Sequence, residues 1–170
     1  DGRIENQVKN EYRELNLSNP PKFIWANSSA QAREIIDSET EIDMIICMFN
    51  EQDKGIFPFA SELKDKGCGI PFILLIHYSK AVRQRVLESP HNGVDFVFSW
   101  HGNADLILAI VKLLEDAANA ENDVFEVGVK GILLVEDSIR YYSNYLPELY
   151  KIILTQSREF LTESLNDDQK

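Results

Sequence analysis

The chain has few cysteines and no long hydrophobic run, and each shortage excludes a class of protein. Cys47 and Cys68 are the only cysteines, too few for a disulfide framework, so we interpret both as reduced thiols of a cytoplasmic protein. The longest uninterrupted apolar run spans residues 70–76, far short of the ~20 residues that a membrane-spanning helix needs. No basic segment is followed by an apolar one, so we expect no secretory signal.

Basic residues are also scarce. The 170 residues include 17 Lys and Arg against 28 Asp and Glu, a net charge of −11. A duplex-DNA binder needs clustered basic side chains, and so does a protein that binds an anionic membrane, so we expect neither nucleic acid nor membrane as a partner. The 44% share of hydrophobic residues is enough to bury the core of one domain, or of one domain and a piece of another.

The spacing of the hydrophobic residues predicts alternating helices and strands over residues 1–118. The runs at 43–49 and 71–76 are almost continuously apolar, which is typical of strands buried on both faces of a parallel sheet. Other segments predict strands at 22–26 and 94–98, and helices at 4–17, 32–36 (capped from 27–29), 57–66, 81–87 and 103–118. This alternation predicts right-handed crossovers and three α/β/α layers.

The last fifty residues predict a linker, a strand and a long helix. Polar residues open the segment 119–130, which we interpret as a linker, and the apolar run at 131–135 predicts a strand. The helix that follows extends from 139 to 165. Pro147 should bend this helix, because proline removes a backbone donor and crowds the preceding turn.

One motif carries a resemblance to a known family. The run from Gly131 to Ser138, GILLVEDS, ends with the acidic pair Glu136 and Asp137 before its serine. It resembles the opening of a receiver domain of two-component response regulators, the CheY-like family, whose first strand ends in two acidic residues. Residues 1–118 resemble a receiver that lacks its first strand, and residues 131–170 resemble the first strand and helix of a second receiver.

The resemblance implies a flavodoxin-like α/β fold with three α/β/α layers. Its five-stranded parallel sheet has the order 2-1-3-4-5, and this chain adds a long carboxyl-terminal helix. In that sheet the first strand is central. Without it, the strands at 22–26 and 43–48 would each leave a row of backbone donors and acceptors unpaired. We expect residues 131–135 to fill the gap, either within the same chain or exchanged between two chains.

Receiver chemistry requires four kinds of side chain. A carboxylate pair holds Mg²⁺, an Asp on the third strand accepts phosphate, and a hydroxyl on the fourth strand and a Lys on the fifth bind phosphoryl oxygens. The alignment places Met48 at the acceptor position, Ile76 at the hydroxyl position and Trp100 at the lysine position. A thioether forms no stable acyl phosphate, and neither other side chain supplies the hydroxyl or the ammonium. The resemblance therefore implies a degenerate receiver that is not an enzyme and needs no cofactor.

Two metal alternatives stay open. Glu136 and Asp137 are weak Mg²⁺ candidates, and we prefer to interpret them as favourable charges at the start of the following helix. His77 and His101 are expected to follow neighbouring strands. Two imidazoles without a further ligand are a weak metal signal, so loop polarity is the preferred interpretation of both.

The resemblance also implies a partner surface. Receivers meet partners around the end of the fifth strand, where Trp100 and His101 are expected, although Trp100 also fits as a filler of the space left by the lost lysine. The helix at 139–165 has more apolar side chains than a lone helix should expose, among them Tyr142, Leu146 and Leu149. We therefore expect a homodimer with this helix at or near the interface.

Together these features favour a non-catalytic pseudo-receiver that serves signalling or regulation through contacts with proteins. Two alternatives stay open. The chain fits a fragment of a phospho-accepting tandem response regulator, whose acceptor lies elsewhere. It also fits the regulatory amino-terminal part of an enzyme of the PEP synthase or pyruvate, phosphate dikinase type, which residues 132–150 resemble loosely.

Overall fold

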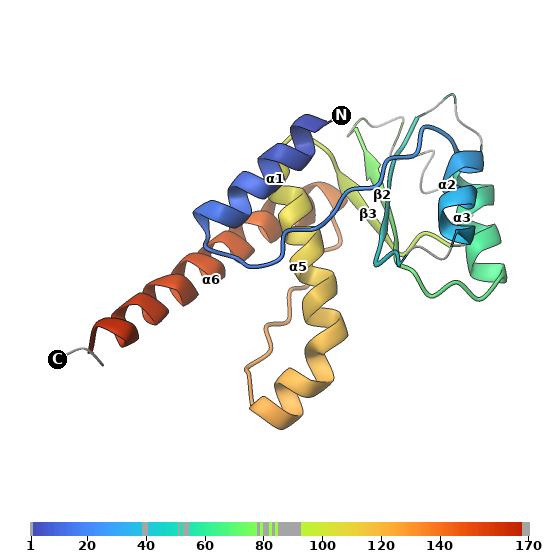
Figure 1. Cartoon of the computed structure of the whole chain (residues 1–170). Helices are drawn as coiled ribbons and strands as arrows, with labels where there is room; N and C mark the ends of the chain where they lie inside the picture. Colours follow the sequence, from blue (N-terminus) through green and yellow to red (C-terminus); the bar gives the residue numbers. More distant parts are fainter. Residues whose placement is uncertain are drawn as a thin grey trace. The chain divides into compact units, whose positions relative to one another are not determined.

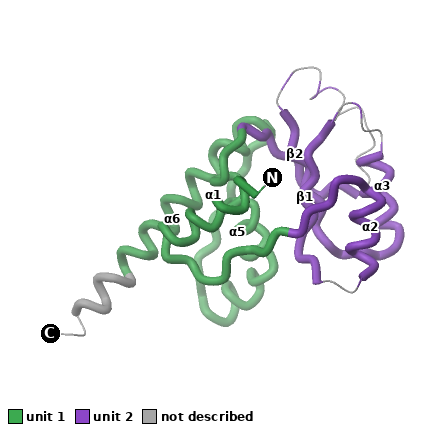
Figure 2. The backbone as a smooth tube through the Cα atoms, turned by 45° about the horizontal axis from the view of Figure 1, so that its top comes forward, with its two compact units in different colours: residues 1–23, 102–170 green, residues 24–101 purple. Residues whose placement is uncertain are grey.

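The computed structural model of the chain divides into two compact units (Figure 2). Unit 1 comprises residues 1–23 and 102–170, and unit 2 comprises residues 24–101. This division differs from the expected one, which had boundaries at 118 and 131. The structure describes residues 2–38, 41–50, 52, 55–77, 79, 82, 84 and 93–167, with side chains as far as Phe160. Most of the helix predicted at 81–87 lies outside the described residues.

Unit 2 contains a parallel sheet whose described strands have the order β1-β2-β3 (Figure 1). β1 is Ile45–Met48, β2 is Phe72–Ile76 and β3 is Phe96–Ser99, and each overlaps a run predicted as a strand. β2 is buried along its whole length, as expected for a strand with neighbours on both sides. The α/β class and the parallel pairing are confirmed, whereas the described residues form three strands and not five.

Two helices lie on the same side of this sheet (Figure 1). They are α2 (Ser29–Asp37) and α3 (Ile56–Asp65). Ser28 begins α2 as predicted, because its side chain accepts a hydrogen bond from the backbone of the first helical turn. In α3, the ring of Phe59 meets the ring of Phe72 in β2 edge-on, with centroids 5.9 Å apart. This aromatic contact packs α3 against the centre of the sheet.

An ionic contact joins α2 to α3. Arg33 donates to the Glu62 carboxylate from Nε at 2.9 Å and from Nη2 at 2.6 Å, and Lys66 donates to the same carboxylate at 2.9 Å. These hydrogen bonds, the one from Arg33 first, lower the pKa of Glu62 to about 2. The Arg33 guanidinium also lies 4.9 Å from the centroid of the Phe59 ring. The cluster therefore fixes the two helices to each other.

Two further contacts fix the amino-terminal ends of β2 and β3. The Asp95 carboxylate accepts the Phe72 N–H at 2.7 Å and lies 2.9 Å from Lys64 Nζ. Gly93 has a φ of +98°, and a Cβ at this position would lie 2.3 Å from the carbonyl carbon of Ala60. Only glycine accommodates both the positive φ and the close approach. These contacts set where β3 begins relative to α3.

Unit 1 is helical, and its α5 contacts both α1 and α6 (Figure 1). α1 is Gly2–Glu14, α5 is Ala104–Glu121 and α6 is Ile139–Asp167, which confirms the three helices predicted in these regions. Lys112 Nζ of α5 lies 5.4 Å from the Tyr12 ring centroid of α1. The Tyr150 hydroxyl of α6 donates to Asp116 of α5 at 2.7 Å. Arg158 of α6 donates to the Glu14 carbonyl of α1 at 2.7 Å. Across the described part of the chain, every helix is too short or too polar to cross a membrane.

The linker predicted at 119–130 is wrong over most of its length. α5 continues to Glu121, and a π-helical segment, η1 (Asn122–Val127), follows it directly. Residues 119–127 are polar at first but contain no glycine or proline, so nothing in them stops a helix. The helix ends at Gly128, which has a φ of +77°, a conformation that glycine adopts without strain.

The strand predicted at 131–135 does not form within this chain. Neither these residues nor residues 22–26 belong to the sheet that the structure describes. Leu133 is 89% exposed and Val135 is 82% exposed. The prediction that residues 131–135 insert next to β1 of their own chain is therefore wrong. A strand needs a neighbour for its backbone groups, and the exchanged form, which involves a second chain, stays a prediction.

Candidate functional site

The site that the resemblance implies lies at the carboxyl ends of the three described strands of unit 2. Met48 is the last residue of β1, Ile76 is the last residue of β2, and Trp100 follows β3 directly. The register pairs Met48 with Leu75 and Ile76 with Ser99. The Trp100 N–H donates to the Ile76 carbonyl at 2.8 Å. The structure therefore places the three predicted positions along one edge of the sheet.

The three side chains at this edge are poorly suited to phosphate chemistry. Met48 is 40% exposed, whereas Ile76 is fully buried and Trp100 is 7% exposed. None of the three has a carboxylate, a hydroxyl or an ammonium group. The burial of Trp100 argues against its direct contact with a partner and fits the alternative that it fills space. His101, the other residue predicted for a partner surface here, is exposed.

Ser99, which has a hydroxyl at the same edge, was not predicted from the sequence. Ser99 is fully buried, and its Oγ lies 3.2 Å from Nε2 of His101. A serine in the otherwise aromatic and aliphatic run at 96–100, FVFSW, was the signal that could have found it. Because a buried hydroxyl needs a partner, we assign this contact to holding the end of β3. The hydroxyl position of the family falls on Ile76 of the neighbouring strand.

Acidic residues do not gather at this edge in the part of the chain that the structure describes. Within that part, no group of three or more His, Cys, Asp or Glu side chains is placed to hold a metal ion. His77 is exposed and follows β2, and the ring of His101 is in contact with Ser99. Neither histidine therefore belongs to a described metal centre.

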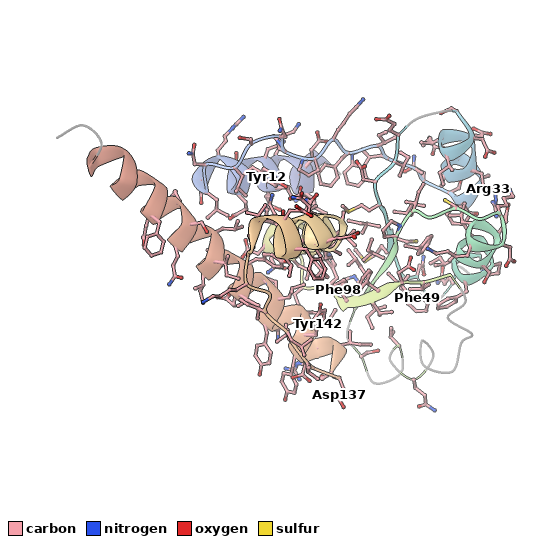
Figure 3. All side chains as sticks on the ribbon, turned by 90° about the horizontal axis from the view of Figure 1, so that it is seen from below. Tyr12, Arg33, Phe49, Phe98, Asp137 and Tyr142 are labelled. Atoms are coloured by element: carbon pink, nitrogen blue, oxygen red, sulfur yellow. The ribbon has the colours of Figure 1, made fainter. Side chains whose placement is uncertain are left out.

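The acidic pair of the GILLVEDS motif lies in unit 1, immediately before α6. The Glu136 carboxylate accepts the Ser138 N–H at 2.9 Å, and Asp137 is exposed at the amino-terminal end of the helix (Figure 3). Carboxylates at this end of a helix are stabilised by its dipole and by its unpaired N–H groups. The geometry thus supports the preferred interpretation of the pair as helix-terminal charges.

The three partner residues predicted on α6 are largely turned into unit 1. Leu146 is buried, and Tyr142 and Leu149 are partly buried. Burial raises the pKa of the Tyr142 phenol. Since α6 contacts α5, its apolar side already has a packing partner within the unit. A second protein could reach Leu146 only if the helices separated.

A different face of α6 is exposed. Tyr141, Tyr145 and Ile152 are each about half exposed, and their spacing of four and seven residues places them on one side of the helix. The rings of Tyr141 and Tyr145 stack at 6.0 Å between centroids, with an interplanar angle of 12°. We call these three residues the α6 stripe. These residues were not predicted from the sequence, because periodicity does not show which of two apolar faces a neighbouring helix covers.

The comparisons with known proteins do not supply a family. No family model, curated protein or solved structure matches the chain. The resemblance to receivers therefore depends on the GILLVEDS motif and on the order of helices and strands. The geometry of this edge is the basis on which a function is proposed.

Proposed function

We propose that the chain is a non-catalytic pseudo-receiver, a signalling or regulatory module that takes up no phosphate and acts by contacting proteins. The observation that carries the proposal is the set of side chains along one edge of the sheet. Met48, Ile76 and Trp100 end three adjacent parallel strands, where a receiver needs an aspartate, a hydroxyl and a lysine. All three replacements occur in register, which favours loss of the chemistry over a shifted alignment.

Each replacement removes one step of phosphate transfer. A methionine sulfur at the end of β1 leaves no carboxylate to attack a phosphoryl donor. A buried isoleucine at the end of β2 cannot donate to a phosphoryl oxygen, and a buried tryptophan after β3 brings no positive charge. Among the described residues, Mg²⁺ binding at this edge would likewise lack the carboxylates that a hard cation prefers.

The proposal includes the finer fold assignment. We assign β1, β2 and β3 to the third, fourth and fifth strands of a flavodoxin-like sheet of order 2-1-3-4-5. Their parallel pairing and their order in the sheet support this assignment. The two reduced cysteines, Cys47 and Cys68, support a cytoplasmic location.

The proposed partner surface is the α6 stripe, and the proposed partner is a second copy of the chain. Tyrosine is enriched in protein interfaces because it provides a large, rigid contact area with a polar tip. Two stacked tyrosines and an isoleucine on one helical face, Tyr141, Tyr145 and Ile152, form such a surface. The homodimer predicted from the helix at 139–165 is thus retained, with the interface moved from the side that carries Leu146 to the neighbouring exposed side of the helix.

Phosphorylation by a small-molecule donor tests the loss of chemistry. The full chain is incubated with acetyl phosphate and Mg²⁺ and analysed on a phosphate-binding gel, beside a receiver that is known to take up phosphate. We expect no phosphorylated, slower-migrating band from this chain. Stoichiometric labelling that is lost on alkaline treatment, as an acyl phosphate is, would overturn the proposal.

The Met48→Asp variant is the matched control for this experiment. Since Met48 is 40% exposed, the new carboxylate can remain hydrated and the variant should fold. We expect it to stay unlabelled, because Ile76 and Trp100 still provide no donor for the phosphoryl oxygens. Efficient labelling of this single variant would show that the edge retains receiver chemistry and would contradict the proposal.

A further inference from the structure

The segment of residues 131–135, GILLV, has the composition of an interior strand but is exposed. Four of its five residues are large and aliphatic, and Leu133 and Val135 are exposed over more than four fifths of their surface. Exposed apolar groups of this extent in a water-soluble chain are typical of an interaction site. The segment is therefore an exposed apolar surface that packing within unit 1 does not explain.

The sequence of this segment is similar to that of β2. Residues 132–135 read ILLV, and residues 73–76 of β2 read ILLI. Alternate residues of a strand point to opposite faces of a sheet, so an all-aliphatic strand needs apolar cover on both faces. β2 has this cover, since all its residues are buried. Residues 131–135 would obtain it only by joining a sheet.

The outer edge of β1 is a place where a strand can join. Ile45 and Phe49 donate their N–H groups toward β2, so the alternating backbone groups of Ile46 and Met48 face away from β2. In the described part of the chain, β1 pairs with β2 alone. β1 itself, IICM, contains no proline or charged residue, the features by which exposed edges usually prevent further pairing.

We propose that residues 131–135 of one copy pair, as an added strand, with the outer edge of β1 in a second copy. Each copy provides one strand and one β1 edge. The strand of each copy pairs with the β1 edge of the other, so the assembly closes as a dimer. The inference rests on the homodimer of the proposed function, and it adds the element that is exchanged. Three residues separate the exchanged segment from α6, which begins at Ile139, so the segment is continuous with the proposed α6 interface.

Disulfide trapping tests the pairing directly. Cys47 lies in β1, and adjacent strands lie about 4.8 Å apart, within the range that a disulfide spans. Single cysteines are introduced at positions 132, 133, 134 and 135 of a full-length Cys68→Ser chain, which together sample both faces and neighbouring registers. Equal amounts of ¹⁴N- and ¹⁵N-labelled chains are mixed, unfolded, refolded together and mildly oxidised, and the cross-linked peptides are identified by mass spectrometry.

We expect at least one of the four variants to form a disulfide with Cys47 that joins a ¹⁴N peptide to a ¹⁵N peptide. The matched control is Phe125→Cys, which introduces a cysteine at an exposed position of η1 outside the segment and should not form this link. A link to Cys47 found only within single chains would overturn the exchange. So would the absence of any link from all four positions.

The dissociation constant of the dimer, measured by sedimentation, separates this inference from the proposed homodimer. Leu133→Asp should weaken the dimer at least about tenfold, because an apolar side chain that becomes buried is replaced by a charge. Phe125→Asp should change the constant by less than about threefold, as expected for a side chain outside the interface. A stable dimer that Leu133→Asp leaves intact but Tyr145→Asp dissociates would overturn the strand exchange and keep the α6 homodimer. A chain that stays monomeric overturns both.

Discussion

The phenol of Tyr12 offers a quantitative test of the packing in unit 1. Tyr12 lies on α1 (Figure 3) and is 1% exposed. Its buried hydroxyl oxygen has no hydrogen-bond partner among the described residues. Burial, with repulsion from the Glu115 carboxylate, raises the pKa of this phenol to about 12. Lys112 Nζ lies over the ring, a cation–π contact that a phenylalanine would keep.

Tyr12→Phe removes the oxygen and little else. A buried hydroxyl without a partner costs about 1–3 kcal/mol, and the small gap that the missing oxygen leaves offsets part of this gain. We therefore expect the variant to raise the free energy of unfolding by about 1 kcal/mol, with a rise in Tm of roughly 2–4 °C for a chain of this size. Urea unfolding followed by circular dichroism at pH 7 measures the change, and the m value should stay the same.

Tyr150→Phe is the matched control and should have the opposite sign. The Tyr150 hydroxyl donates to the Asp116 carboxylate at 2.7 Å, and burial, together with this contact, raises its pKa. Loss of a hydrogen bond to a charged group should lower the free energy of unfolding by about 1–2 kcal/mol. If Tyr12→Phe destabilises the chain as much as Tyr150→Phe does, the Tyr12 hydroxyl has a partner, and the reasoning is refuted.

The same phenol predicts a pH dependence. The pKa of Tyr12 is about 12 in the folded chain and 10.0 as its ordinary value. The folded chain therefore holds this proton after the unfolded chain has lost it. Ionisation of this phenol leaves the free energy of unfolding unchanged below pH 10 and lowers it as the pH rises from 10 through about 12. Between these values the free energy of unfolding should fall less steeply in Tyr12→Phe than in the parent chain. Parallel curves for the two proteins would contradict the assignment.

Two further predictions concern unit 2. Gly93→Ala should destabilise the chain by about 2 kcal/mol or more, because Gly93 has a positive φ and the new Cβ would overlap the backbone of Ala60. A loss of less than about 0.5 kcal/mol in the free energy of unfolding in urea would show that this turn is not tightly packed. The second concerns Glu62, whose pKa is lowered from 4.5 to about 2 by Arg33 and Lys66. Its contribution to stability is present above pH 4.5 and is lost as the pH falls through about 2. In a plot of Tm against pH, Glu62→Gln should therefore make the fall in Tm below pH 4.5 less steep. A slope equal to that of the parent chain would refute a stabilising role for this cluster.

Local patterns were sufficient to predict most helices and the paired strands. Residues 71–76 predicted β2 because an unbroken apolar run suits a strand buried on both faces, and the structure buries all of Phe72–Ile76. The three site positions came from the resemblance to receivers, and the ends of the parallel strands do bring Met48, Ile76 and Trp100 to one edge. The strands needed only periodicity, whereas the site positions also needed the resemblance.

The errors arose where the outcome depends on distant neighbours. Residues 131–135 have a strand composition, but strand formation needs an adjacent edge that sequence periodicity does not provide. The burial of Leu146 and Trp100 depends on tertiary packing, and the same side chains would suit a partner surface if that packing were absent. The linker at 119–130 was predicted from polarity, whereas the helix stops only where Gly128 takes a positive φ.

The central claim is that the edge formed by β1, β2 and β3 has lost phosphate chemistry. Beryllofluoride with Mg²⁺ mimics the phosphorylated aspartate of a receiver, so a titration of the ¹⁵N-labelled full chain, followed by amide NMR, tests the claim most directly. We expect no saturable shift at Met48, Ile76 or Trp100 beyond that caused by Mg²⁺ or fluoride alone. Saturable shifts centred on these three residues, with an affinity that depends on Mg²⁺, would contradict it.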